Sequence, residues 1–172
     1  MAISLPATFS LLRPVSLCLT LALAPISEAQ TMADESVAWL QEFIRIDTIN
    51  PPGNESRAVE FFARILEAEG IPYQTAESAP GRGNIWARLE GGDEPALIML
   101  QHTDVVPADM KYWTVDPLGG EISDGYLWGR GALDMKSGVV MMVCAFLRMH
   151  VSGKRPSGDI ILCLMSDEEA RS

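Results

Sequence analysis

The sequence has few basic residues, and those it has are not clustered. Lysine and arginine together number 13 against 23 acidic residues, which gives a formal net charge of −10. Nucleic acids and anionic membrane surfaces are bound through concentrated positive charge, so we expect neither as a partner. The acidic balance instead favours solubility and the binding of cations.

Long apolar runs and cysteine motifs are also missing. The apolar run over residues 15–24 is too short to span a bilayer, so we expect no stable membrane anchor. The sequence contains 3 cysteines and no Cys-x-x-Cys pair. Cys144 and Cys163 lie inside apolar segments and are predicted to be packed thiols rather than metal ligands or a disulfide.

The first 29 residues differ from the rest of the chain. Arg13 precedes the apolar run, and residues 27–29 have the small-x-small pattern of a cleavage site. This pattern predicts a signal peptide over residues 1–29 and export of the mature protein to the periplasm or the extracellular space. The competing interpretation is a misassigned start, because Met32 directly precedes a helical pattern.

Helical and strand patterns alternate after this segment, without internal repeats. Helices are predicted from Asp34 to just before Asn50, over residues 56–70 and over residues 136–149. Strands are predicted over residues 71–75, 84–89, 96–100 and 159–165, with a hairpin at 121–128. Two of these strands, 96–100 and 159–165, are continuously apolar, which is typical of strands covered on both faces. We therefore expect an α/β domain with a mixed, largely parallel sheet flanked by helices.

A histidine and a carboxylate follow the first continuously apolar strand. His102 and Asp104 are two residues apart, and a metal-bound histidine commonly donates its other ring proton to such a carboxylate. Taken alone, a His-x-Asp pair is more often part of an ordinary surface loop. The only other histidine, His150, falls at a predicted helix end, where a contact with the helix terminus is the better interpretation.

Asp134 lies in a glycine-rich segment just before the helix that begins near Lys136. Such an aspartate can face a bound ion, and it can equally cap the helix. A phosphate-binding loop is a third interpretation, because Gly131, Lys136 and Ser137 mimic its spacing. It fails at Met135, where that loop requires a glycine.

Glu168 and Glu169 follow the second continuously apolar strand. Adjacent residues on an extended backbone point in opposite directions, so one carboxylate could bind a metal while the other acts as a base. A solvated acidic turn is the plainer interpretation of such a pair. Together with His102 and Asp134, however, the pair indicates one site with two metal ions, which suits Zn²⁺, with Co²⁺ or Mn²⁺ as alternatives and Mg²⁺ not excluded.

At these residues the chain resembles the zinc-dependent superfamily that contains glutamate carboxypeptidase, aminoacylase, acetylornithine deacetylase and succinyl-diaminopimelate desuccinylase. The resemblance extends from Trp39 to the end of the sequence. The segments that carry it are residues 45–55, 102–107, 113, 116–117, 124–138 and 167–169.

The resemblance implies a role for each candidate residue. His102 would bind one metal, Glu169 the other, and Asp134 would bridge the two. Asp104 would orient His102, and Glu168 would be the general base. Arg171 departs from the glycine or small residue that the superfamily often has after the Glu-Glu pair.

The resemblance also implies a function. Residues 30–172 would be the N-terminal part of a metallopeptidase catalytic domain, ahead of further ligands and of a lid and dimerisation domain. The full protein, which could be a homodimer, would be a carboxypeptidase, aminoacylase or deacylase. It would cleave an amide or peptide bond near a free carboxylate, in a small peptide or N-acyl amino acid, with a water held between the metals. The alternative is an inactive fragment or a binding module with an incomplete metal site.

Overall fold

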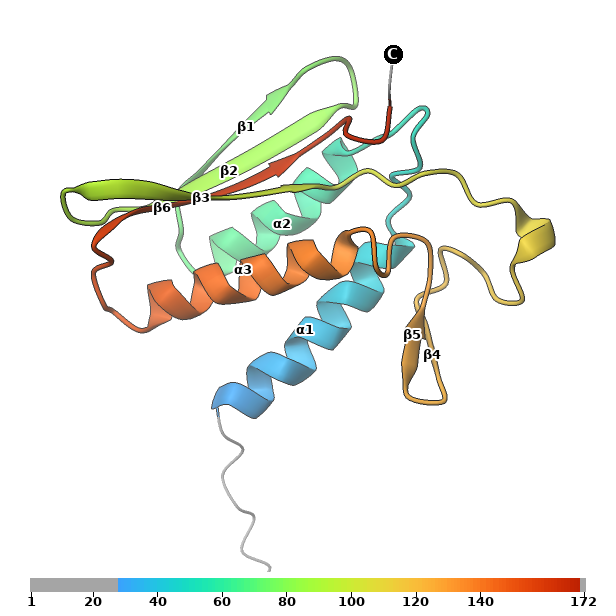
Figure 1. The fold of residues 1–172 in the computed structure, drawn as a ribbon, viewed down its shortest axis with the longest axis horizontal. Helices are drawn as coiled ribbons and strands as arrows, with labels where there is room; N and C mark the ends of the chain where they lie inside the picture. The colour runs from blue at the N-terminus through green and yellow to red at the C-terminus, as the bar shows by residue number, and fades with distance from the viewer. Residues whose placement is uncertain (1–27, 171–172) are drawn as a thin grey trace, which may run out of the picture.

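Three α-helices and two sheets make up residues 28–170, the part of the chain that the computed structural model describes (Figure 1). In chain order the elements are α1 (Glu28–Arg45), α2 (Ser56–Ala68), β1 (Tyr73–Glu77), β2 (Gly83–Leu89), β3 (Glu94–His102), the 3₁₀ turn η1 (Met110–Tyr112), β4 (Glu121–Ser123), β5 (Tyr126–Trp128), α3 (Lys136–Val151) and β6 (Gly158–Met165).

The main sheet has the strand order β1-β2-β6-β3. The β3 and β6 strands pair in parallel and α3 connects them, which confirms the predicted strand-helix-strand unit. The other two pairings, β1 with β2 and β2 with β6, are antiparallel. The sheet is therefore mixed, as predicted, but within residues 28–170 it is not largely parallel.

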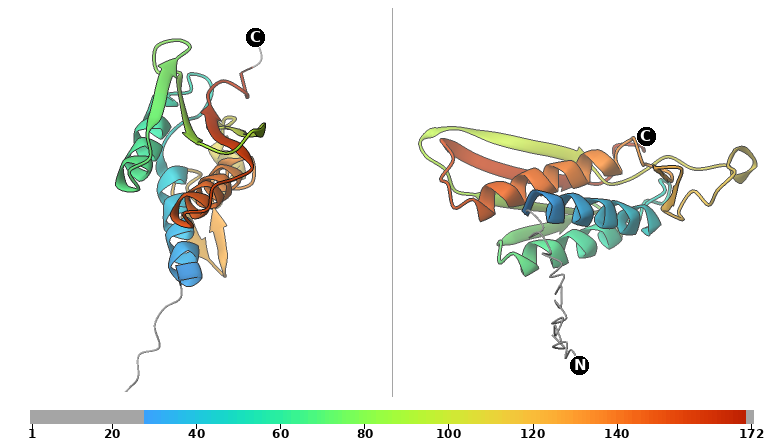
Figure 2. Two further views of the ribbon diagram at one scale, coloured as in Figure 1. Left: turned by 90° about the vertical axis from the view of Figure 1, so that its left-hand side faces the viewer. Right: turned by 90° about the horizontal axis from the view of Figure 1, so that it is seen from below.

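The helices all cover the same face of this sheet, and the core lies between them (Figure 2). Alternate residues of β2 and β6 point to this face, because successive side chains of a strand alternate between its two sides. Among them Ile85, Leu162 and Leu164 are buried in one cluster with Phe43 and Phe62. This packing holds in place the strands whose ends carry the candidate site.

The outer side of the sheet differs from the prediction. Leu97, Ile98 and Leu100 of β3 are 55–60% exposed, although the apolar run predicted a strand covered on both faces. β3 is the edge strand of the described sheet, and the described helices cover only one face.

Cys144 and Cys163 are free thiols and only partly buried.

The second sheet is the predicted hairpin of β4 and β5. Its turn residues, Asp124 and Gly125, have φ of 53° and 80°, the left-handed conformation that a two-residue hairpin turn requires.

The N-terminal part of the chain begins differently from the prediction. Helix α1 starts at Glu28 rather than at Asp34. It runs through residues 28–30, where the cleavage site was predicted, while residues 1–27 of the predicted signal peptide lie outside the described part. No helix within residues 28–170 combines the length and the apolarity needed to cross a membrane.

Candidate metal centre

Parallel pairing brings the predicted site segments to one end of the sheet. His102 ends β3 opposite Met165 at the end of β6, and Thr103 N donates to Met165 O at 2.8 Å. The segments that follow the two strands therefore run side by side. Because α3 connects β3 to β6, its N-terminus lies at the same end, and Asp134 directly precedes it.

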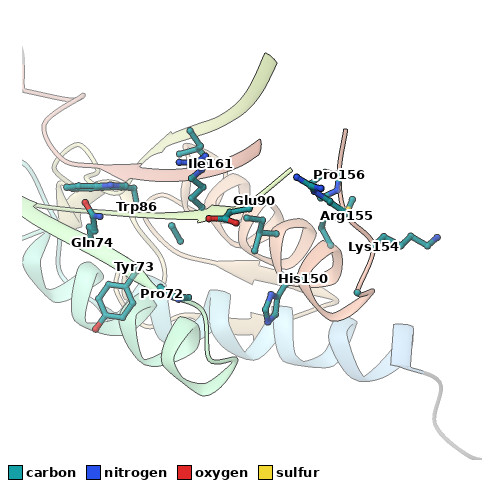
Figure 3. Close-up of a pocket in the computed structure, with 15 residues that line it drawn as sticks. Pro72, Tyr73, Gln74, Trp86, Glu90, His150, Lys154, Arg155, Pro156 and Ile161 are labelled. Carbon is teal, nitrogen blue, oxygen red and sulfur yellow. The ribbon is translucent and has the colours of Figure 1, made fainter. Parts of the chain in front are cut away.

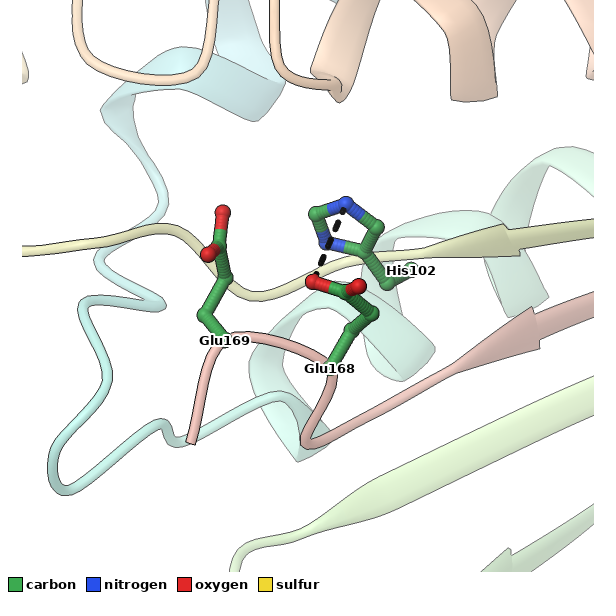
Figure 4. A group of neighbouring side chains, drawn as sticks. All are labelled: His102, Glu168 and Glu169. Carbon is green, nitrogen blue, oxygen red and sulfur yellow. Dashed lines mark ion pairs between the residues drawn. The ribbon is translucent and has the colours of Figure 1, made fainter. Parts of the chain in front are cut away.

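The candidate ligands converge there (Figure 4). Ligand atoms of His102, Glu168 and Glu169 all lie within 4.8 Å of one another. His102 Nε2 also lies 3.4 Å from Asp134 Oδ1 and 3.9 Å from Glu168 Oε2. Three of the four predicted side chains thus form one cluster, and Asp134 lies beside it through its contact with His102.

Asp104 lies behind the imidazole ring of His102. His102 Nδ1 is 3.1 Å from the backbone oxygen of Asp104 and 3.4 Å from its carboxylate Oδ1. Both atoms accept, so Nδ1 is the ring nitrogen that carries the proton. Once the ring loses its second proton, the lone pair is on Nε2, on the side of Asp134 and Glu168, which is the arrangement that metal-binding histidines require.

The carboxylate of Asp104 is fully buried and has several hydrogen-bond donors. It accepts the amide Nδ2 of Asn50 at 2.7 Å and the backbone N–H groups of Glu168 and Glu169 at 3.2 and 2.9 Å. Burial would raise the pKa of Asp104, but these donors and His102 outweigh it and hold the pKa well below its usual range. The hydrogen bond with Asp104 in turn raises the pKa of His102 to about 9 against the opposing effect of burial.

The charges of the cluster leave room for a cation. Within residues 28–170, His102 is the only basic side chain within 4 Å of the carboxylates of Asp134 and Glu168, and no basic side chain lies that close to the carboxylate of Glu169. Burial and the neighbouring carboxylates raise the pKa of Glu169, although His102 lowers it. An imidazole nitrogen with several carboxylate oxygens is a donor set that Zn²⁺ accepts, so the residues fit the metal that the sequence predicted.

Two local predictions are settled by the backbone. Asp134 does not cap α3, because the residue at the N-cap position is Met135. Glu168 and Glu169 do not continue an extended strand: Asp167 has φ of 74°, and the chain turns there. Both glutamates consequently reach toward His102 instead of pointing to opposite sides (Figure 4).

Asn50 is a site residue that the sequence reasoning missed. The segment before it pairs with the segment after His102: Ile49 bridges Val105, and Asn50 N donates to Val105 O at 2.8 Å. This brings the Asn50 amide to the carboxylate of Asp104. The sequence showed Asn50 only as the start of an Asn-Pro-Pro-Gly turn that ends a helix, and no local pattern records its contact with Asp104.

Lys136 is the second missed residue. Its side chain is fully buried, and Nζ donates to Phe43 O at 2.8 Å and to Ile46 O at 2.7 Å. Lys136 therefore joins the C-terminal end of α1 to the start of α3, two residues from Asp134. Burial lowers the pKa of Lys136 to about 7.

The described surface contains cavities, two of which bear on the candidate centre or its surroundings. One of about 790 Å³ is formed by the C-terminal end of α3 and parts of β1, β2 and β6, and it contains no predicted site residue (Figure 3). The other, of about 580 Å³, is lined by Leu40 and by residues 112–115 and 126–134. This second cavity is rich in aromatic side chains and borders the candidate centre at Asp134.

His150 lies apart from the centre, as predicted. It is in the last turn of α3, and its Nε2 is 3.2 Å from Glu69 O.

Comparison with known proteins places these features in a family. The model of peptidase family M20/M25/M40 matches residues 98–172. Succinyl-diaminopimelate desuccinylase of Rhodospirillum centenum is 39% identical over 147 residues, which cover 80% of this chain and 36% of the relative. The chain thus spans about a third of the length of the curated relatives it matches.

Solved structures agree in fold. Human carnosine dipeptidase 1 superposes with a TM-score of 0.64 at 27% identity, over 83% of this chain and 34% of the dipeptidase. An M20 family metallo-carboxypeptidase from Sulfolobus solfataricus superposes with a TM-score of 0.66 at 23% identity, over 79% of this chain and 31% of that enzyme.

The comparisons also correct the expected localisation. The prediction of an exported protein is wrong: the matched curated relatives are succinyl-diaminopimelate desuccinylases, and the comparisons do not support export. Residues 28 and 29 of the suggested cleavage pattern lie in the first turn of α1.

The order of the motifs, the mixed α/β fold and the matches to both sequences and structures agree with one another. The chain belongs to the superfamily of metallopeptidases and related hydrolases that contains peptidase family M20/M25/M40.

Proposed function

We propose that residues 30–172 are the N-terminal part of the catalytic domain of a metal-dependent hydrolase that cleaves an amide or peptide bond near a free carboxylate. One observation carries the proposal: His102, Glu168 and Glu169 place their ligand atoms within 4.8 Å of one another, and Asp134 adds a carboxylate 3.4 Å from His102. The names of the relatives, a desuccinylase and a dipeptidase, support an amide substrate.

The proposed metals are two zinc ions, with cobalt or manganese as alternatives. His102 and Asp134 would hold one ion, and Asp134 and Glu169 the other. Bound zinc lowers the pKa of water to about 7 and stabilises negative charge that develops on a carbonyl oxygen.

The protein residues would contribute orientation and proton transfer. Asp104 keeps the proton of His102 on Nδ1, so that Nε2 faces the centre. Glu168 is the candidate general base, because its side chain lies beside His102 Nε2 at 3.9 Å and is still 59% exposed to an incoming substrate. It would take a proton from the attacking water and return it to the leaving amine.

The aromatic cavity beside Asp134 is the proposed seat for an apolar group of the substrate. It is about 580 Å³ in volume, within the range of small-molecule sites, and Trp113, Tyr126 and Trp128 contribute to its lining. Small peptides and N-acyl amino acids are the substrate class that fits a centre of this kind next to such a cavity.

The test is an assay of the product of the full reading frame with N-acyl amino acids and dipeptides, before and after removal and return of Zn²⁺. Glu168→Gln should lower turnover about a hundredfold to ten-thousandfold and leave the metal content unchanged. Glu169→Gln is the matched variant and should lower the metal content. Hydrolysis that persists without metal, or metal loss in both variants that tracks the loss of rate, would contradict the proposed roles.

The described residues supply at most two ligands from the predicted set to each ion, whereas catalytic zinc usually has three protein ligands. We therefore propose that the 172-residue chain alone binds metal weakly and lacks turnover. Tight binding of two ions with measurable hydrolysis by the isolated chain would contradict this.

A further inference from the structure

The turn that carries Glu168 and Glu169 depends on the backbone of Asp167. Its φ of 74° is in the left-handed region, which side-chain-bearing residues adopt rarely. A turn of this kind persists only where surrounding contacts hold it. The contacts that hold Asp167 therefore determine where the next two side chains point.

Asp167 is held by groups on either side of its backbone. Its Oδ1 accepts from Arg82 Nη2 at 2.6 Å and from Asn50 Nδ2 at 3.3 Å. Its backbone N–H donates to Glu55 Oε1 at 3.3 Å. Two of these partners, Arg82 and Glu55, also bind each other.

The pair of Arg82 and Glu55 is doubly hydrogen-bonded and largely buried. Arg82 Nε lies 2.7 Å from Glu55 Oε2, and Arg82 Nη2 lies 2.7 Å from Glu55 Oε1. The Glu55 side chain is 0% exposed and that of Arg82 is 14% exposed. A two-pronged contact fixes the plane of the guanidinium, so the remaining donor direction of Nη2 toward Asp167 is fixed as well.

Gly53 leaves the space for this pair. A Cβ at this position would lie 2.5 Å from Glu55 Oε2 and 2.6 Å from Arg82 Nε, and the φ of Gly53 is 100°. The Asn-Pro-Pro-Gly segment therefore supports both the carboxylate of Asp104 and the ion pair of Arg82 with Glu55. Its first residue contacts Asp104, and its last makes room for the ion pair.

Asn50 connects this pair to the ligand-orienting carboxylate. Its Nδ2 donates to Asp104 Oδ2 at 2.7 Å as well as to Asp167. The opposite orientation of the amide would place its oxygen against two carboxylates, so the contacts assign the nitrogen to this side. Asp104 then receives the backbone N–H groups of Glu168 and Glu169.

We propose that Arg82 and Glu55 are positioning residues that hold the turn at Asp167 and thereby aim Glu168 and Glu169 at His102. Neither touches the candidate centre itself, and their contribution to metal binding rests on the function proposed above. The ion pair acts through one shared atom, Arg82 Nη2, which contacts both Glu55 and Asp167.

The test replaces Arg82 in the 172-residue chain and follows the turn directly. Arg82→Met removes both ion pairs and keeps an apolar stem, and Arg82→Lys restores the charge without the two-pronged contact. Arg88 provides the matched control, because it lies in β2, forms an ion pair with Asp159 at 2.5 Å and is 59% exposed. Arg88→Met and Arg88→Lys are therefore the same changes at a pair that does not reach the turn.

The first measurement is amide hydrogen exchange by NMR in the metal-free chain. Arg82→Met should speed exchange at Glu168 and Glu169 at least about tenfold, while exchange at Leu162 in the middle of β6 changes less than about twofold. Arg82→Lys should lie between Arg82→Met and the wild type, and both Arg88 variants should match the wild type. A loss of general stability would instead speed exchange at Leu162 by the same factor.

The second measurement is Co²⁺ binding by the product of the full reading frame that carries the same substitutions, followed by calorimetry and visible absorption. Arg82→Met should weaken affinity about 10- to 100-fold, with partial recovery in Arg82→Lys and no change in the Arg88 variants. If Arg82→Met does not fold, Asp167→Ala and Asp167→Gly take its place. Both remove the carboxylate, but glycine tolerates the positive φ, so exchange at Glu169 should be slower in the glycine variant.

The two measurements separate this inference from the proposed function. A product of the full reading frame that binds no Co²⁺ would contradict the metal centre, while the exchange data still decide whether Arg82 holds the turn. Unchanged exchange at Glu168 and Glu169 in Arg82→Met would overturn the positioning role. Exchange in the wild type as fast as in an unstructured peptide would overturn it equally.

Discussion

Asp104 accepts a hydrogen bond from the backbone N–H of Glu169 at 2.9 Å. One buried carboxylate on the segment after β3 thus anchors the acidic turn after β6, while it also faces His102 Nδ1 at 3.4 Å. Orientation of the histidine and placement of the glutamates are therefore coupled through a single side chain.

Asp104→Asn should disturb both parts of this arrangement. The side-chain NH₂ of the new asparagine would face groups that donate to Asp104 in the wild type. At least one of these buried donors would lose its acceptor, which lowers the free energy of unfolding by about 1–3 kcal/mol. Metal affinity should fall about 10- to 100-fold, as for other residues that orient a metal-binding histidine. Denaturant unfolding and Zn²⁺ titration measure the two effects.

The control for this variant is Asp93→Asn, an exposed aspartate ahead of β3. It should change neither quantity appreciably. Equal Zn²⁺ affinity of Asp104→Asn and the wild type would refute the orienting role of Asp104.

Lys136→Met should destabilise the fold. The variant leaves the carbonyl oxygens of Phe43 and Ile46 without the Nζ donor, and a buried acceptor without a partner costs about 1–3 kcal/mol. Lys154→Met, at an exposed lysine, should change stability by less than about 0.5 kcal/mol. Urea unfolding of the two variants checks this, and equal midpoints would show that the buried amine contributes nothing.

The sequence predicted the candidate site better than the surroundings that hold it. His102, Asp134, Glu168 and Glu169 could be found because each is a metal-type ligand at the end of an apolar segment, and a parallel strand pair brings such ends together. Asn50 and Arg82 could not, because their partners are 54 and 85 residues away in the sequence and no local pattern records those contacts.

Part of the fold was also predictable from the sequence. The strand-helix-strand unit of β3, α3 and β6 follows from periodicity, because both strands are apolar and the helix between them is amphipathic enough to cover one face. The exposure of Leu97, Ile98 and Leu100 did not follow, since an apolar run indicates that a strand can be covered but not which element covers it. The turn at Asp167 was missed because a left-handed aspartate has no sequence signature.

Zn²⁺ affinity should rise with pH because His102 must lose a proton to bind. The pKa of His102 in the metal-free fold is raised to about 9, chiefly by Asp104, from an ordinary value of 6.5. This proton therefore stabilises the metal-free fold below pH 6.5, and the stabilisation is lost as the pH rises through about 9. Between about pH 6.5 and 8, affinity should increase about tenfold per pH unit.

Calorimetry in buffers of different ionisation enthalpy measures the proton released on Zn²⁺ binding. About one proton per histidine-bound ion is expected at neutral pH. An affinity that levels off above pH 6.5 would indicate a histidine with an ordinary pKa and would contradict the contact with Asp104.

The most direct test of the metal centre is a Co²⁺ titration of the product of the full reading frame, followed by visible absorption, for the wild type and for His102→Ala. His150→Ala is the matched control, because it removes the other histidine, which lies at the end of α3 next to Glu69 O. The wild type and His150→Ala should give the same saturable binding curve, and His102→Ala should weaken binding by at least about tenfold. Identical curves for all three proteins would contradict a metal centre at His102.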